Sequence, residues 1–120
     1  MDDFNLSFFH RKKFRVGEVI FDEGTHGEED YLLDAGAVDI QKQRPDGWHP
    51  IGRIKPGGIF GEMALIDDEP RMARAVAVAD SLCVVITRDR LKAKLDAADP
   101  LLRGLLRIFV QNIRSLAQTP

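Results

Sequence analysis

Cysteine is almost absent from this 120-residue chain, because Cys83 is the only one, and an internal disulfide is therefore excluded. A single cysteine also fits a reducing compartment. Long apolar runs are missing too, and none approaches the roughly 20 residues that cross a bilayer. Residues 1–14 place acidic residues before an apolar patch and basic residues after it, which is the wrong order for a secretory signal. We expect a cytoplasmic protein with no membrane span.

Neither sign of charge is in large excess, since the chain has 17 basic and 19 acidic residues and a net charge of −2. Lysine and arginine are spread along the chain, so no basic patch predicts direct contact with nucleic acid. The histidines are also few. His10, His26 and His49 have no close spacing and no accompanying acidic cluster, which argues against a metal site and a cupin-like metalloenzyme. No nucleophile has a paired base. We therefore expect no catalytic residue, no metal, no cofactor and no enzyme activity.

The length predicts one domain over residues 1–120, and an apolar content of 44% is ordinary for a globular protein. Residues 1–13 are expected to form a short helix or an arm. From about 14 to 87, short β-prone runs alternate with turn signals, a pattern typical of a sandwich or barrel. Asp46-Gly47 lies between two such runs and predicts a hairpin tip. The predicted strands are 18–21, 31–34, 37–43, 49–54, 74–79 and 82–87.

The residues from about 88 to 117 follow a helical period instead. Thr87 can cap a helix that contains Leu91 and Leu95, and Asp99-Pro100 predicts the start of another. Strands followed by helices give an α+β fold. The last helix is predicted to be amphipathic and carries an apolar stripe that needs a surface to cover. The stripe consists of Leu102, Leu105, Leu106, Phe109, Ile113 and Leu116.

The segment from 60 to 73, FGEMALIDDEPRMA, is the most informative part of the chain. Gly61 opens a short helix-forming run. The first amides of a helix lack internal partners, and the helix dipole makes that end attractive to an anion. Gly61 allows a close backbone approach and Ala64 leaves space. We predict that the backbone amides of Met63 and Ala64 donate to a phosphate.

Two charged residues complete this predicted site. Arg71 can form two parallel hydrogen bonds to phosphate oxygens, which lysine cannot imitate. Glu62 would repel a phosphate, so its carboxylate is expected to accept a hydrogen bond from a sugar hydroxyl. The alternative is that Glu62 and Arg71 form an ordinary surface ion pair around a turn.

The same segment is similar to the phosphate-binding cassette of cyclic nucleotide-binding domains. FRVGEVIFDEG (14–24) resembles the first strands of that family, and Lys55-Pro56-Gly57 resembles the turn before its cassette. The resemblance implies a double-stranded β-helix, a jelly-roll-like β-roll of about eight strands, with flanking helices and a C-terminal amphipathic helix. It also implies a cAMP or cGMP ligand, with Glu62 at the ribose and Arg71 at the cyclic phosphate. The predicted ligand-binding residues are Gly61, Glu62, Met63, Ala64, Arg71, Met72 and Ala73.

Two positions depart from the family pattern. In that family, a threonine directly after the arginine is associated with preference for cGMP. Met72 occupies this place and lacks the hydroxyl, which favours cAMP; it would contact the base or simply fill the roll. Arg74 would either add positive charge near the phosphate or point outward from its strand. Arg107, Asn112 and Arg114 are polar candidates for covering the base, although residues of this kind are more often solvated on an exposed face.

The sequence therefore predicts a regulatory domain in which capture of a cyclic nucleotide repositions the last helix. That helix would contact a second copy of the chain or an effector protein. The alternative function is a β-roll that serves dimerisation or scaffolding and no longer binds nucleotide. Asp67, Asp68 and Glu69 are expected to form an exposed, solvated turn.

Overall fold

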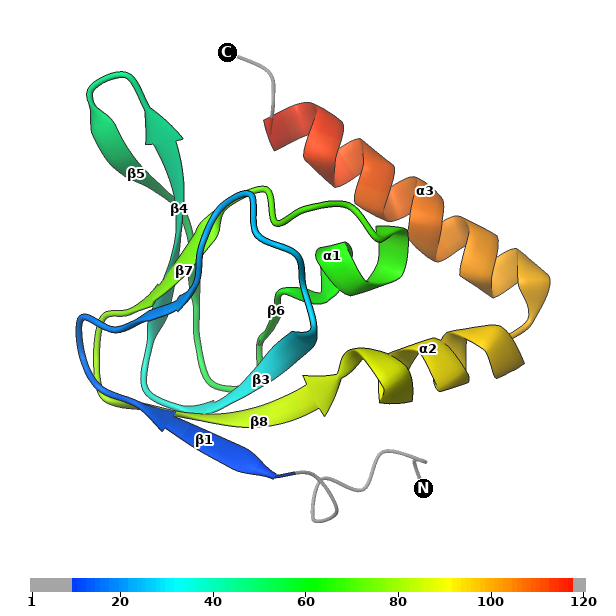
Figure 1. Ribbon diagram of the computed structural model, residues 1–120, viewed down its shortest axis with the longest axis horizontal. Coiled ribbons are helices and arrows are strands. Elements are labelled where there is room, and N and C mark those ends of the chain that lie inside the picture. Colours follow the sequence, from blue (N-terminus) through cyan, green and yellow to red (C-terminus); the bar gives the residue numbers. More distant parts are fainter. Residues whose placement is uncertain (1–9, 118–120) are drawn as a thin grey trace.

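The structure is a computed structural model that describes residues 10–117, and its strands form two four-stranded antiparallel sheets. The first sheet has the order β1-β8-β3-β6 and the second the order β2-β7-β4-β5 (Figure 1). The prediction of a β-roll with about eight strands is thereby confirmed. The strands are β1 (Arg11–Phe14), β2 (Val19–Phe21), β3 (Glu29–Ala35), β4 (Val38–Arg44), β5 (Gly47–Ile54), β6 (Ile59–Phe60), β7 (Arg74–Ala77) and β8 (Ser81–Thr87).

The core lies between the two sheets and is rich in aromatic rings. Tyr31 stacks on Phe60 with ring centroids 5.3 Å apart, and Phe14 meets Tyr31 edge to face at 5.9 Å. Cys83 is fully buried in this core, and burial raises the pKa of its thiol to about 11. Val85 completes the same face of β8. The inner surface is thus dry and apolar.

Both faces of β8 are buried, which explains its nearly continuous run of apolar residues. Cys83 and Val85 face the core, while Val84 and Ile86 face the opposite side of the sheet. Asp30 of β3 pairs with Ile86 and so faces the same opposite side. Helix α1 packs against β3, and this places a short helix over a buried carboxyl group.

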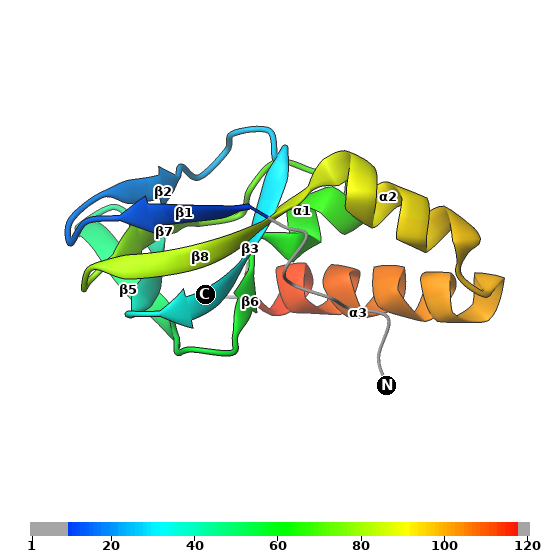
Figure 2. The same ribbon diagram turned by 90° about the horizontal axis from the view of Figure 1, so that it is seen from below.

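Three helices, α1 (Glu62–Asp67), α2 (Arg88–Ala97) and α3 (Pro100–Ala117), gather at one end of the sheets (Figures 1 and 2). The predicted caps are confirmed, because Thr87 Oγ1 accepts from the Arg90 amide at 3.4 Å and Asp99 Oδ1 accepts from the Leu101 amide at 2.8 Å. Helix α1 contacts both α2 and α3. Within residues 10–117, no helix is long and apolar enough to cross a membrane.

Three local predictions need correction. Residues 11–13 were expected in a helix or arm, but they form β1, whose backbone pairs with β8; residues 1–9 lie outside the described part of the chain. The β4–β5 hairpin turns at Pro45 and Asp46, one residue earlier than expected, and Gly47 already pairs with Arg44. The two-residue strand β6 was not predicted, because its pairing with Tyr31 and Leu32 is a tertiary contact.

Candidate functional site

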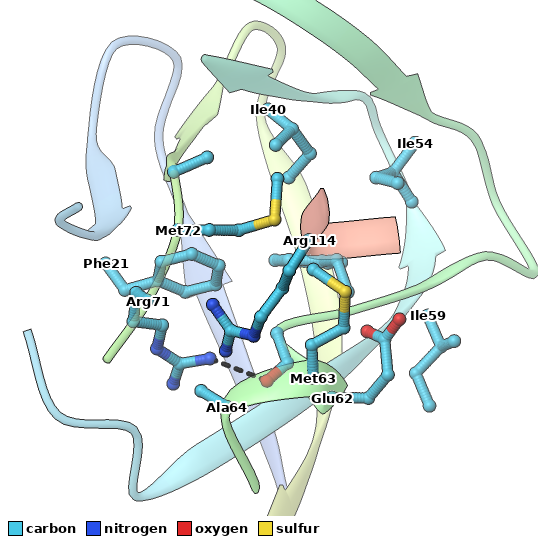
Figure 3. A pocket seen from close by; sticks show the side chains of 13 residues that line it. Phe21, Ile40, Ile54, Ile59, Glu62, Met63, Ala64, Arg71, Met72 and Arg114 are labelled. Carbon is cyan, nitrogen blue, oxygen red and sulfur yellow. Dashed lines mark hydrogen bonds between the residues drawn. The ribbon is translucent and has the colours of Figure 1, made fainter. Parts of the chain in front are cut away.

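A pocket of about 130 Å³ opens between the second sheet, α1 and α3 (Figure 3). All seven residues that the sequence singled out line this pocket. Aromatic and aliphatic side chains form the rest of its wall, together with one arginine from α3. The lining residues are Phe21, Ile40, Ile54, Ile59, Phe60, Gly61, Glu62, Met63, Ala64, Arg71, Met72, Ala73 and Arg114.

Gly61 precedes α1 in a left-handed conformation, with φ at 87°. A side chain here would be strained by that backbone angle. A β-carbon would also lie 2.5 Å from Nη1 of Arg71 and 3.2 Å from the ring of Phe21. Glycine is therefore required at position 61 both for the turn and for the arginine beside it.

Arg71 is buried, with 6% of its surface exposed, and its guanidinium is held at a fixed place. Nη1 donates to the carbonyl oxygen of Gly61 at 2.8 Å (Figure 3), and Nη2 donates to the carbonyl oxygen of Glu29 at 2.5 Å. The guanidinium also lies 4.0 Å from the ring centroid of Phe21, a cation–π contact. Burial lowers the pKa of Arg71, but arginine keeps its charge in proteins.

The backbone of Arg71 is anchored as firmly as its side chain. Its amide donates to the carbonyl of Thr25 at 2.9 Å, and its own carbonyl accepts from the Gly24 amide at 2.7 Å. Nε of Arg71 is buried and has no hydrogen-bond partner within the described residues. A buried donor of this kind is costly unless it is satisfied. Arg71 therefore brings to the site a positive charge and one N–H donor that no described residue uses.

Glu62 begins α1, and its carboxylate also lines the pocket (Figure 3). Burial raises the pKa of this carboxyl, and the charge of Arg71 offsets only part of the effect. Glu62 and Arg71 do not form a direct ion pair in the described structure, since Arg71 donates to two carbonyl oxygens instead. The alternative of a simple surface ion pair between these two residues is wrong.

Asp30 lies beneath the start of α1 and is almost completely buried, with 1% of its surface exposed. Its Cα would be 3.5 Å from a β-carbon at Gly61. Neither carboxyl oxygen has a hydrogen-bond partner among the described residues. Burial, followed by the nearby charge of Glu62, raises the pKa of Asp30 to about 7, while Arg71 acts in the opposite direction. Sequence reasoning did not identify this residue.

Arg114 was predicted to be either a cover for the base or a solvated residue, and the structure buries it. Only 15% of its side chain is exposed, and it lines the pocket from α3, entering the same space as Met63 and Met72 (Figure 3). It pairs with Asp67, whose side chain is 11% exposed. The expectation of a solvated turn is therefore wrong for Asp67, whose partner lies 47 residues away in the sequence. The other two candidates, Arg107 and Asn112, are exposed.

Arg74 belongs to a different part of the surface. Its guanidinium lies 3.7 Å from the ring centroid of Trp48, and its Nε donates to Oε1 of Gln41 at 2.8 Å. Arg74 does not line the pocket. The prediction that Arg74 points away from the phosphate site is therefore confirmed, and the alternative that it adds positive charge there is wrong.

The remaining lining residues were not identified from the sequence. Phe21, Ile40, Ile54, Ile59 and Phe60 come from four different strands, and they meet only because the two sheets fold over each other. Their alternation with polar residues predicts a buried face but not which cavity that face borders.

A family model for the cyclic nucleotide-binding domain matches residues 11–98. Among curated proteins, a cAMP-dependent protein kinase regulatory subunit from Aspergillus niger is 37% identical over 91 residues, which are 76% of this chain and 22% of that protein. The cyclic AMP receptor protein of Thermus thermophilus is 30% identical over 113 residues, 93% of this chain and 52% of that protein. The chain thus spans about a fifth to a half of the length of these relatives.

Solved structures show the same architecture. The EAL enzyme Bd1971 in its cAMP-bound form is 28% identical, with a TM-score of 0.84 over 88% of this chain and 28% of that one. Its cGMP-bound form gives a TM-score of 0.85 over 91% of this chain and 29% of that one. The Thermus thermophilus catabolite activator protein is 30% identical, with a TM-score of 0.72 over 94% of this chain and 52% of that one.

Proposed function

This chain belongs to the cyclic nucleotide-binding domain family, and from that membership we propose that it is a regulatory domain that binds cAMP in preference to cGMP and catalyses no reaction itself. One observation carries the proposal most directly. Arg71 is buried at the wall of a pocket, and it is held there by two carbonyl oxygens and an aromatic ring. A buried cation that faces a hollow, with no carboxylate ion-pair partner in the described part of the chain, is suited to a phosphate.

Each cassette residue then has a role. Arg71 and the backbone amides of Met63 and Ala64 would bind the cyclic phosphate. Glu62 would accept a hydrogen bond from the ribose 2′-hydroxyl, and its raised pKa supports this role because a desolvated carboxylate gains from a neutral donor. Ala73 would form part of the apolar wall.

The preference for cAMP rests on Met72. Its thioether lines the pocket and offers an adaptable apolar contact to a purine but no hydroxyl for the guanine amino group. Lys42 donates to its backbone carbonyl at 2.6 Å, which holds the residue at the wall. The structurally similar EAL enzyme has been solved with either nucleotide, so the β-roll architecture accommodates both purines in that protein.

We expect isothermal titration to show saturable binding of cAMP, weaker binding of cGMP and much weaker binding of 2′-deoxy-cAMP. The deoxy analogue leaves the Glu62 carboxylate buried without its hydrogen bond, and sites of this kind reject such analogues strongly. In the variant Glu62→Gln, the discrimination against the deoxy analogue should shrink. If the parent and the variant discriminate equally against the deoxy analogue, Glu62 does not bind the ribose hydroxyl. A folded protein that binds no nucleotide would favour the scaffold function.

The last helix would transmit the signal. Its apolar stripe is left to solvent, with Leu102, Phe109 and Leu116 exposed at 58%, 55% and 75%. These three residues are seven apart in sequence, and Leu106 and Ile113 are likewise seven apart, the spacing of contact positions in a coiled coil. This spacing favours a second copy of the same helix over an unrelated effector surface. We propose a homodimer paired through α3, with the helix repositioned when cAMP binds.

Light scattering coupled to size exclusion is therefore expected to give twice the 13.5 kDa mass of one chain. Phe109→Glu should reduce the mass to that of one chain, because a carboxylate in the centre of the stripe would be buried without a partner. Ile51→Glu is the control, since it changes an exposed apolar residue on β5. A monomeric parent protein at high micromolar concentration would overturn the homodimer and leave the stripe for an effector protein.

A further inference from the structure

Asp30 lies at the point where β3, the start of α1 and the cassette arginine meet. Arg71 is anchored to the backbone on either side of it. Its Nη2 donates to the carbonyl oxygen of Glu29, the residue before Asp30, at 2.5 Å, and its Nη1 donates to that of Gly61 at 2.8 Å. The Cα of Asp30 lies 3.5 Å from the place that a β-carbon on Gly61 would occupy. A charge on Asp30 is therefore close to the residues that we assign to the phosphate.

The carboxyl group of Asp30 has no polar partner in the described part of the chain. The residue is 1% exposed, and neither of its oxygens accepts or donates a hydrogen bond there. Asp39, which is also buried, accepts two hydrogen bonds from Arg53. An ionised carboxylate without such bonds is costly, whereas the protonated acid is tolerated at much lower cost. Asp30 consequently has two states of different charge, neutral and negative, beneath the start of α1.

Two charged side chains act on Asp30 from the elements around it. The negative charge of Glu62 opposes its ionisation, and the positive charge of Arg71 favours it. Strands β6 and β8, which flank β3 in its sheet, contain no charged residue. Arg71 is therefore the cation that Asp30 and a bound phosphate would share. The other charged residues of β3, of α1 and of the adjoining turn and helix start pair elsewhere: Glu29 with Lys12, Asp34 with Arg11, Asp67 with Arg114, and Asp68 with Arg88.

We propose that Asp30 makes capture of the cyclic nucleotide depend on pH, with tight binding when its carboxyl group is protonated and weaker binding when it is ionised. This inference rests on the proposed function and adds the proton as a second input to the same site. A negative Asp30 competes with the phosphate for the charge of Arg71 and repels the phosphate, while a neutral Asp30 does neither.

The direction of the effect follows from proton linkage. In the ligand-free protein, burial and the charge of Glu62 raise the pKa of Asp30 to about 7. An anionic phosphate beside Arg71 offsets the charge that lowers this pKa, so the pKa of Asp30 is higher in the complex. Binding therefore takes up a proton near neutral pH, and the affinity falls as the pH rises through this range. A shift of about one pKa unit corresponds to an affinity change of about tenfold.

Isothermal titration with cAMP at pH 6 and pH 9 measures this dependence. We expect the parent protein to bind about fivefold to tenfold more weakly at pH 9 than at pH 6. Asp30→Asn introduces a neutral side chain of the same shape, so its affinity should stay within about twofold across this range and match that of the parent at pH 6. At pH 7.5, titrations in buffers of different ionisation enthalpy should show uptake of about half a proton per cAMP by the parent and almost none by the variant.

Two control variants test other sources of pH dependence. Asp39→Asn makes the same chemical change in a buried acid of the other sheet, where Arg53 is its partner. His26→Gln removes an imidazole, the group that ordinarily titrates near neutral pH, from its contact with Arg88 at 3.4 Å. Both variants should keep the pH dependence of the parent. If His26→Gln loses it while Asp30→Asn keeps it, the histidine is responsible and the proposal fails.

Glu62→Gln tests whether the titrating group is Asp30 or Glu62 itself. Because the charge of Glu62 raises the pKa of Asp30, this variant should move the fall in cAMP affinity to lower pH without abolishing it. A pH dependence that disappears in Glu62→Gln would assign the titration to Glu62 and overturn the role of Asp30.

The same titrations separate failure of this inference from failure of the proposed function. A parent protein whose cAMP affinity is the same at pH 6 and pH 9 would overturn the role of Asp30 and leave the proposed function intact. A folded parent protein that binds no cyclic nucleotide at either pH would overturn both.

Discussion

Replacing Arg71 by alanine is expected to weaken cAMP binding by more than about thirtyfold in isothermal titration. Removal of one partner of a buried charged pair costs about 2–5 kcal/mol, and each 1.4 kcal/mol is tenfold in affinity. The loss should be large here because Arg71 is fixed by Gly61, Glu29 and Phe21 before any ligand arrives. Little ordering of its side chain is then required on binding.

Arg74→Ala is the matched control, because it removes the same charge three residues further along, where the arginine stacks on Trp48 outside the pocket. Its affinity for cAMP should remain within about threefold of the parent. Thermal unfolding of both variants would show whether the fold survives. A folded Arg71→Ala protein that retains the parent affinity would exclude Arg71 from the phosphate site.

The second large effect concerns stability. Asp30→Asn is expected to raise the free energy of unfolding by about 2–4 kcal/mol at pH 8 and by only about 1 kcal/mol near pH 4.5. The reason is that Asp30 is buried without a hydrogen-bond partner among the described residues, and its pKa in the folded protein is raised to about 7. In the unfolded chain an aspartic acid titrates near its ordinary value of about 3.9.

The sign follows from proton binding. Between these two pKa values the folded protein holds a proton on Asp30 that the unfolded chain has lost. Stability therefore falls as the pH rises from about 4 to about 7. Above the pKa of Asp30 in the folded protein, both states have lost the proton and Asp30 causes no further loss of stability. Asparagine has no such titration, so the variant should lack this part of the pH dependence.

Urea unfolding of parent and variant at a series of pH values measures this difference directly. Asp39→Asn is the control, because Asp39 is also buried but accepts two hydrogen bonds from Arg53, so its replacement should not stabilise the protein at any pH. If Asp30→Asn shifted stability equally at pH 4.5 and pH 8, the carboxyl group would not titrate as the burial of Asp30 implies.

Some helices and strands of this protein can be predicted from the sequence, and others cannot. The caps of α2 and α3 follow from Thr87 and Asp99, because a hydroxyl or carboxylate oxygen bonds amides two or three residues away. The strands with turn signals between them were also predicted. Strand β1 was missed, because the basic run at residues 11–13 becomes a strand only through pairing with β8.

The candidate site divides in the same way. The predicted cassette residues form two short runs in the sequence, 61–64 and 71–73, and the resemblance to a known motif joins the two runs into one site. Asp30 was not identified from the sequence, and Arg114 was named only as one of three polar candidates for covering the base. The partner of Arg114 is 47 residues away, and Asp30 lies one residue before the predicted strand 31–34, although β3 includes it.

The amino-acid sequence by itself determined the order of the elements, the caps and the cassette, because these depend on hydrogen bonds and backbone angles within a few residues. Tertiary structure alone decided which walls enclose the pocket, that the apolar stripe of α3 faces solvent, and that Asp30 is dry. Those features depend on contacts between segments distant in the chain, where burial changes both the pKa of a carboxyl group and the partner of an arginine.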